Sequence, residues 1–181
     1  MVTFIVLVIP TLIYVVVQFR GRGRPGLQES CEREGATWGR PREYFLALAL
    51  AVPMVGLGLL ALSVIPTDVL EDPAVSTAQI TSLGVIVAVV FRALGEEVFF
   101  RGLLGGIFIR RLGFGWGNVL QATVFLVPHL ALVVVDARVW PLLPVQWVDG
   151  WILGWLRYRS DSFVPGTLIH AAANTAVGLA G

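Results

Sequence analysis

Two adjacent carboxylates lie inside an apolar stretch of this sequence, where ionisable side chains are costly. Glu96 and Glu97 follow a run of apolar residues, and Arg101 comes four residues after Glu97. A charge at membrane depth costs roughly 2.5–3.5 kcal/mol on insertion scales, so such residues indicate a functional site. The spacing of Glu97 and Arg101 places both on one helical face, where they can pair. Glu96 points about 100° away from Glu97 and can face a cavity.

The only two histidines of the chain stand in later apolar stretches, His129 four residues after Phe125 and His170 four residues before Asn174. The ring of Phe125 can therefore cover His129, and one helical face offers the imidazole of His170 together with an amide. A buried glutamate near a histidine can take a proton from water. A histidine and an asparagine can donate hydrogen bonds to a developing oxyanion. The set thus indicates hydrolysis, and because it contains no serine or cysteine, a covalent acyl-enzyme is not favoured.

Helix geometry predicts that these polar residues converge. At a rise of about 1.5 Å per residue, Glu96, His129 and His170 lie about 12–20 Å from one common end of their predicted helices. This depth corresponds to the middle third of a bilayer. We therefore expect a shared internal cavity lined by polar side chains from three helices.

The composition indicates an integral membrane protein. Of the 181 residues, 56% are hydrophobic and only 14% are charged, and the mean hydropathy is +0.81. Soluble domains carry about 25% charged residues. A formal net charge of +1 without a basic patch gives no indication of nucleic-acid binding. The single cysteine, Cys31, cannot form an intrachain disulfide and has no neighbouring ligands for a structural zinc.

The apolar runs predict an all-α fold, a polytopic transmembrane helical bundle of about six spans with a buried polar site. The spans are expected at residues 2–18, 44–66, 77–111, 118–135, 140–156 and 163–180. A bend is expected at Gly95, and Asp161 or Ser162 is expected to cap the last helix. Between the spans we expect a solvated, partly disordered loop over 19–43, an acidic loop over 67–76 and a glycine turn over 112–117.

The arginines are distributed unevenly between the two sides of this predicted bundle. Six lie within residues 19–43, and Arg110, Arg111, Arg157 and Arg159 fall on the same side, whereas Arg138 falls on the other. Arginine and lysine concentrate in cytoplasmic loops of membrane proteins. The arginine-rich loops are therefore predicted to be cytoplasmic, with both termini on the opposite side.

The site residues resemble three signatures of the CAAX prenyl protease and bacteriocin-processing (Abi, or CPBP) family of intramembrane proteases, namely EExxxR, FxxxH and HxxxN. All three are present in order: Glu96-Glu97-x-x-x-Arg101, Phe125-x-x-x-His129 and His170-x-x-x-Asn174. The resemblance covers residues 79–181, which we interpret as a CPBP-like protease core. Residues 1–78 are interpreted as N-terminal membrane helices with a polar cytoplasmic loop, and they carry no assignable motif.

The resemblance implies a multi-pass intramembrane endopeptidase that cleaves a lipidated (CAAX-type) or hydrophobic peptide or protein. Glu96 would be the general base that activates water, helped by His129, and His170 and Asn174 would stabilise the oxyanion. The supporting residues would be Glu97, Arg101 and Phe125. The expected partners are a peptide or protein substrate, prenylated or not, and membrane lipids. No nucleic-acid partner is expected. The expected location is the plasma membrane of a prokaryote.

The residues leave three alternative functions open. Glu96, His129 and His170 could form a two-histidine, one-carboxylate metal set, although HExxH is absent, so no cofactor is favoured and zinc is the alternative. A non-catalytic bacteriocin-immunity or partner-binding scaffold of the same fold would not need the buried polar set. A small transporter with a proton relay would be expected to show repeated halves or matching broken helices, and the sequence shows neither.

Overall fold

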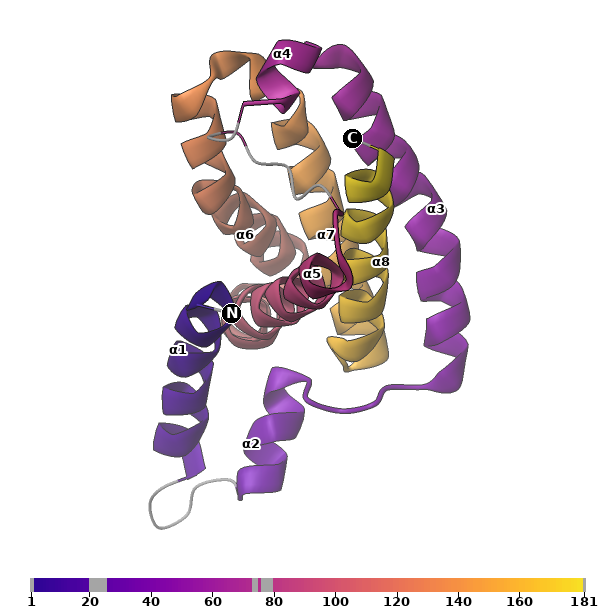
Figure 1. Ribbon diagram of the computed structural model, residues 1–181. Coiled ribbons are helices and arrows are strands. Elements are labelled where there is room, and N and C mark those ends of the chain that lie inside the picture. The colour runs from indigo at the N-terminus through magenta and orange to yellow at the C-terminus, as the bar shows by residue number, and fades with distance from the viewer. Residues whose placement is uncertain (1, 20–25, 73–74, 76–79, 181) are drawn as a thin grey trace.

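The computed structural model describes residues 2–19, 26–72, 75 and 80–180, and over these residues every regular element is a helix. The predicted all-α class is therefore confirmed for the described part of the chain. In chain order the elements are α1 (Val2–Phe19), α2 (Leu27–Glu34), α3 (Pro41–Val64), α4 (Thr67–Leu70), α5 (Leu83–Glu96), the π-helix η1 (Glu97–Gly105), α6 (Gly106–Val135), the 3-10 helix η2 (Ala137–Val139), α7 (Leu142–Ser160) and α8 (Val164–Ala180) (Figure 1).

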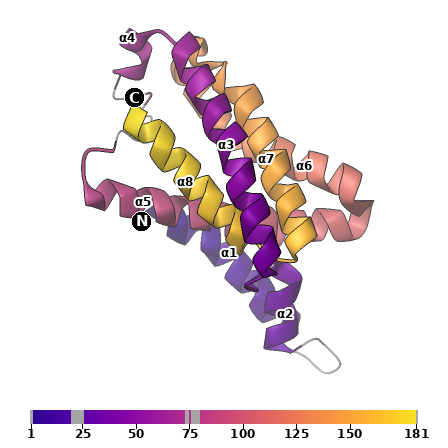
Figure 2. The same ribbon diagram turned by 90° about the vertical axis from the view of Figure 1, so that its right-hand side faces the viewer.

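Three helices, α3, α7 and α8, pack side by side and hold the main apolar core (Figure 2). Its buried members come from all three helices: Ala47, Met54, Leu153, Leu156, Ile169 and Ala173. Small residues such as alanine let helix backbones approach closely where lipid offers no hydrophobic driving force. α6 packs on α7, and α5 packs between α8 and α1. The segments that carry the three motifs are thereby brought together.

The path from Leu83 to Val135 is helical but changes direction within α6. Gly113 there has φ 74° and ψ 168°, a backbone conformation that residues with a side chain rarely adopt. The chain folds back at this point, and a Cβ on Gly117 would lie 2.6 Å from the amide nitrogen of Ile109. The predicted glycine turn is confirmed at Gly113. The predicted bend at Gly95 is wrong, because α5 continues to Glu96 and the backbone then widens into η1.

Two helical stretches are long and apolar enough to cross a membrane, Pro41–Val64 and Leu83–Val135, and Val2–Gln18 is a shorter apolar helix. Large apolar side chains project outward from α3, among them Phe45 and Val52, which are 77% and 74% exposed. An outer surface of this kind suits hydrocarbon better than water, because large apolar patches are rare on soluble monomers.

Arginines make different contacts at the two ends of the bundle. At one end Arg110 and Arg157 both donate hydrogen bonds to the carbonyl oxygen of Arg33, at 3.2 and 3.0 Å. At the opposite end Arg138 pairs with Asp68 at 2.9 Å. Three of the arginines that were predicted to share one side of the bundle, Arg33, Arg110 and Arg157, therefore lie together, although they come from three separate segments.

The segment expected as a loop over residues 19–43 is more ordered than predicted where it is described. It contains α2, which an i,i+4 ion pair between Glu29 and Arg33 at 2.7 Å supports. Gly35 ends α2 in the left-handed conformation, at φ 79°. α3 then begins at Pro41, because proline fits the first turn of a helix. Residues 20–25 lie outside the described part of the chain.

Other boundaries differ by a few residues. The expected acidic loop contains the short helix α4, and the expected helix start near Thr77 lies outside the described residues. α5 begins after Ser82, whose hydroxyl accepts a hydrogen bond from the amide of Val85. Of the two expected caps of the last helix, Ser162 accepts from the amide of Val164 at 3.1 Å. Asp161 instead ends α7 in the left-handed conformation.

Candidate active site

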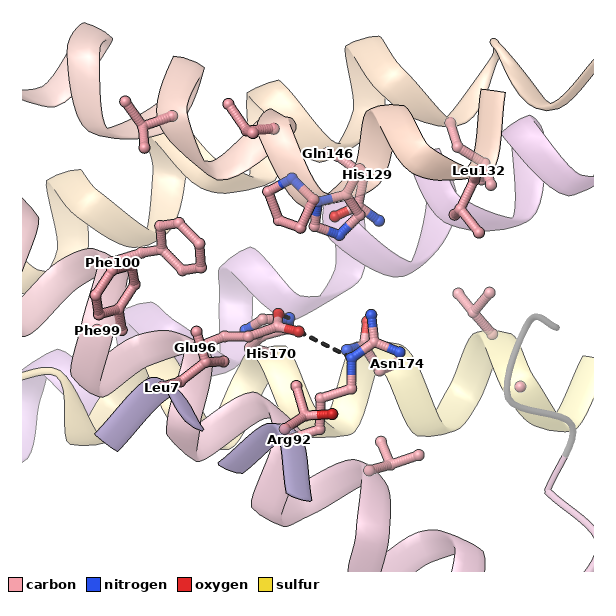
Figure 3. Close-up of a pocket in the computed structure, with 18 of the residues that line it drawn as sticks. Leu7, Arg92, Glu96, Phe99, Phe100, His129, Leu132, Gln146, His170 and Asn174 are labelled. Atoms are coloured by element: carbon pink, nitrogen blue, oxygen red, sulfur yellow. Dashed lines mark hydrogen bonds and ion pairs between the residues drawn. The ribbon is translucent and has the colours of Figure 1, made fainter. Parts of the chain in front are cut away.

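A cavity of about 620 Å³ lies between α5, α6, α7 and α8. Glu96 enters it from the end of α5, His129 from α6, and His170 and Asn174 from α8 (Figure 3). The four side chains to which the sequence analysis assigned catalytic roles thus line one cavity, as the depth estimate predicted. Their roles in catalysis stay a prediction.

Glu96 is held in the cavity wall by two neighbours. Its side chain is only 8% exposed, and its Oε1 accepts a hydrogen bond from Nε of Arg92 at 2.8 Å. Its other oxygen, Oε2, lies 3.6 Å from Nε2 of His170. One carboxylate oxygen is therefore bound by a guanidinium, while the other lies beside an imidazole without a close hydrogen bond. Oε2 is the oxygen that a water molecule in the cavity can approach.

Both imidazoles are anchored through the same ring atom. Nδ1 of His170 lies 2.9 Å from Oε1 of Glu97, and Nδ1 of His129 lies 2.9 Å from the carbonyl oxygen of Phe125. A carboxylate and a carbonyl only accept hydrogen bonds, so Nδ1 carries the proton in each ring. This assignment leaves Nε2 of both histidines available to a reacting group. Fixed outer partners of this kind set the tautomer and the orientation of an imidazole.

The predicted pairing of Glu97 with Arg101 is confirmed. Both side chains are completely buried, and Nη1 of Arg101 lies 3.0 Å from Oε1 of Glu97. The guanidinium carbon of Arg101 also stands 4.2 Å from the ring centre of Phe125, a favourable cation–π contact in a dry environment. Glu97 therefore uses one oxygen for two contacts, with Arg101 and with His170. A buried ion pair is weak evidence for stability by itself, but here it orients a cavity histidine.

Phe125 packs against His129, as the sequence predicted. It is 1% exposed, and its ring centre is 4.8 Å from that of His129 and 5.0 Å from that of Phe100. Neither Glu97 nor Arg101 lines the cavity. Phe125 thus contacts both the cavity histidine His129 and the buried guanidinium of Arg101.

Glu96 lines the cavity and Glu97 does not, as the expected angle of about 100° between them predicted. The two carboxylates nevertheless contact opposite nitrogens of the same imidazole, that of His170. η1 starts at Glu97, and π-helical turns are wider than α-helical turns and are frequent at functional sites. The two carboxylates therefore bracket one histidine.

Several residues of the cavity wall were missed as site residues by sequence reasoning. Arg92 and Gln146 line the cavity, as do Thr3 and Leu7 of α1. Arg92 stands four residues before Glu96 in an apolar helix, the same spacing that identified Glu97 and Arg101 as a pair, so a signal was present. Gln146 is a polar residue in an apolar segment. Nothing in the sequence indicated that α1 would reach the cavity.

The zinc alternative required Glu96, His129 and His170 as ligands. Within the part of the chain that the structure describes, no group of three or more His, Cys, Asp or Glu side chains is arranged to hold a metal ion. Nδ1 of each histidine is engaged, which leaves Nε2 of both rings free, and Glu96 Oε1 is engaged by Arg92. The described side chains therefore do not form a preformed zinc site.

Comparison with protein-family models matches residues 78–176 to a family described as type II CAAX prenyl endopeptidase Rce1-like. No curated protein and no solved structure matches the chain. The matched range is more than half of the 181 residues and contains all three motifs. Proteins of this family are membrane proteins and proteases. The chain therefore belongs to the Rce1-like family of type II CAAX prenyl endopeptidases.

Proposed function

We propose that this protein hydrolyses a peptide bond near the C-terminus of a CAAX-type or hydrophobic peptide, using water that Glu96 activates. The observation that carries the proposal is the position of Glu96 in the cavity wall, with one oxygen bound by Arg92 and the other beside His170. The family match supplies the reaction class. The geometry supplies a base, two imidazoles and an amide around one cavity.

In the proposed reaction, Oε2 of Glu96 takes a proton from a water molecule as the water oxygen attacks the scissile carbonyl carbon. The carbonyl oxygen becomes an oxyanion, which Nε2 of a doubly protonated His170 and the amide of Asn174 stabilise by donating hydrogen bonds. Nε2 of His129 helps to hold the water. The carbon–nitrogen bond then breaks, and the proton taken by Glu96 passes to the leaving amine.

Glu97 and Arg101 act on this reaction through His170. The Glu97 carboxylate holds Nδ1–H of His170 at 2.9 Å and stabilises positive charge on the ring. Arg101 in turn offsets the charge of Glu97, which would otherwise be buried without a cation. The pair thus positions the oxyanion donor without contacting the substrate.

The proposal places the whole reaction within a multi-pass membrane protein. Six crossings would be made by α1, α3, α5 with η1, the part of α6 after Gly113, α7 and α8. Two stretches are apolar and long enough by composition, and the clustering of Arg33, Arg110 and Arg157 at one end supports a cytoplasmic location for that end. The apolar cavity wall supports a hydrophobic or prenylated substrate and contact with lipids. We retain residues 79–181 as the protease core and residues 1–78 as the N-terminal membrane region.

The proposal is tested by peptide cleavage with purified protein in liposomes, using prenylated and unprenylated CAAX peptides. Glu96→Gln keeps the size of the side chain and removes the base, so kcat is expected to fall by about 10²–10⁴-fold. Glu43→Gln is the matched control, because Glu43 is also buried, at 1% exposed, and is paired with Arg159 rather than with the cavity. Full activity of Glu96→Gln, or equal losses in both variants, would refute Glu96 as the base.

The same assay decides the remaining alternatives. Cleavage by the wild type is expected to persist in the presence of a chelator. Loss of cleavage with chelator and recovery with added zinc would establish the metal-dependent version. The absence of cleavage of every peptide by folded wild-type protein would argue against the hydrolase and for a scaffold.

A further inference from the structure

One charged residue of the cavity wall belongs to none of the three motifs. Arg92 lies one helical turn before Glu96 on α5, and its side chain is 51% exposed at the cavity, compared with 8% for Glu96. Among the residues that the structure describes, its only hydrogen-bond partner is Glu96, reached through Nε. A guanidinium has five N–H donors. Both Nη groups of Arg92 therefore remain available to a second acceptor inside the cavity.

The surroundings of Arg92 indicate what kind of acceptor this is. In Figure 3, Phe99 and Phe100 lie on one side of Glu96, whereas Arg92 and Asn174 lie on the other. Much of the cavity wall is apolar, and its aliphatic members include Leu62, Val89, Leu132, Leu142 and Val177. An anion entering an apolar cavity is costly unless a cation receives it. A planar guanidinium matches a carboxylate, which it can bind with two parallel hydrogen bonds.

The separation of Arg92 from Glu96 fits the length of a CAAX leaving peptide. Four residues of helix place Arg92 about 6 Å from Glu96 along α5, and seven residues place Val89 about 10 Å away. In a CAAX sequence three residues follow the cysteine, and three extended residues span at most about 10 Å. If the bond after the cysteine lies at Glu96, the terminal carboxylate of the leaving peptide falls within reach of the long side chain of Arg92. The aliphatic side chains of the leaving peptide then face the apolar wall.

We propose that Arg92 binds the free C-terminal carboxylate of the substrate and thereby sets which bond lies at Glu96. The inference rests on the proposed hydrolysis and adds a carboxylate-binding subsite to it. Nε of Arg92 keeps its contact with Glu96, while Nη1 and Nη2 bind the carboxylate. Selection is then for substrates whose chain ends about three residues after the scissile bond.

The test compares two peptides that differ only at their ends, one with a free carboxylate and one with a C-terminal amide. Charge-assisted hydrogen bonds of this strength correspond to about a 10- to 100-fold difference, so the wild type is expected to show a KM lower by that factor for the acid. In Arg92→Gln the ratio of the KM for the amide peptide to the KM for the acid peptide is expected to fall to about 1. Arg138→Gln is the matched control, because Arg138 is 54% exposed and paired with carboxylates but lies outside the cavity wall. It is expected to retain the preference of the wild type.

The ratio of the two KM values separates a role of Arg92 in binding the substrate from a purely structural role. Loss of its contact with Glu96 alone would lower cleavage of both peptides equally and would leave the preference for the acid intact, which would overturn the proposal. Equal KM values of the wild type for both peptides would overturn it while leaving the proposed hydrolysis in place. Cleavage of neither peptide by folded wild type would refute both. If Arg92→Gln fails to fold, the leaving tripeptide is tested as an inhibitor of the wild type, once as the free acid and once as the amide. Stronger inhibition by the acid is expected, and equal inhibition by both would contradict the subsite.

Discussion

Removing either charge of the buried Glu97–Arg101 pair is expected to cost far more stability than removing a charge of an exposed pair with the same spacing. Both side chains are completely buried and lie 3.0 Å apart. Glu97→Gln leaves the guanidinium without its closest anion, and Arg101→Met leaves the carboxylate without its cation. Breaking a buried pair in this way costs about 3–5 kcal/mol of the free energy of unfolding.

A thermodynamic cycle isolates the interaction between the two residues. In the double variant Glu97→Gln/Arg101→Met no uncompensated charge is left, so its loss of stability is expected to fall about 0.5–3 kcal/mol short of the sum of the single losses. The exposed pair Glu29–Arg33, 2.7 Å apart with side chains 55% and 45% exposed, is the control. Its removal is expected to cost only about 0.3–0.5 kcal/mol.

The assay is equilibrium unfolding in mixed micelles, with a denaturing detergent as the variable and circular dichroism as the signal. Additive losses in the double variant would refute the interpretation of Glu97 and Arg101 as a mutually compensating pair. Equal losses for the buried and the exposed pair would refute the argument from burial. Activity measured on the same samples is expected to fall in Glu97→Gln, because His170 loses the charge that holds its ring.

Three further changes test other parts of the structure. Gly154→Ala is expected to lower the melting temperature, with a loss of about 1–3 kcal/mol, because a Cβ there would overlap Oδ1 of Asn118. Phe125→Leu is expected to cost about 2 kcal/mol by removing the ring beneath the buried guanidinium, and an unchanged melting temperature would contradict this. Burial raises the pKa of Glu34 above its ordinary value despite the opposing effect of Arg110. The folded state then binds more protons than the unfolded state, so the stability of the protein falls as the pH rises from about 4.5 through the pKa of the folded state. Glu34→Gln is expected to flatten this dependence of the melting temperature on pH.

Several features of the site were predictable from the sequence because they depend on local helical geometry. The contact of Glu97 with Arg101 and that of Phe125 with His129 each join residues four positions apart, which share a face of a helix. The common depth of Glu96 and the histidines follows from the constant rise of a helix. The all-helical class follows from the apolar runs. These features need no knowledge of how the helices pack.

Other features depend on packing and were not predictable. Glu96 and Glu97 bracket His170 because α8 places the imidazole between the two carboxylates. Helical spacing predicted that the two carboxylates point in different directions, but not that one histidine lies between them. Residues 19–43 were expected to form a loop from their polarity, yet α2 forms there and packs on η1. Its Glu34 carbonyl lies 3.1 Å from the position of a Cβ on Gly102, so a side chain at position 102 would crowd this contact.

The sequence by itself determined which residues could react and on which helical faces they stand, since residue type and spacing are properties of single segments. Only the tertiary structure decided which partners they have on other helices. Arg92 and Leu7 of α1 line the same cavity, because helices distant in sequence meet there. The free Nη groups of Arg92, and with them the proposed carboxylate subsite, follow from that packing. Contacts between helices depend on all the helices at once, which no single segment can encode.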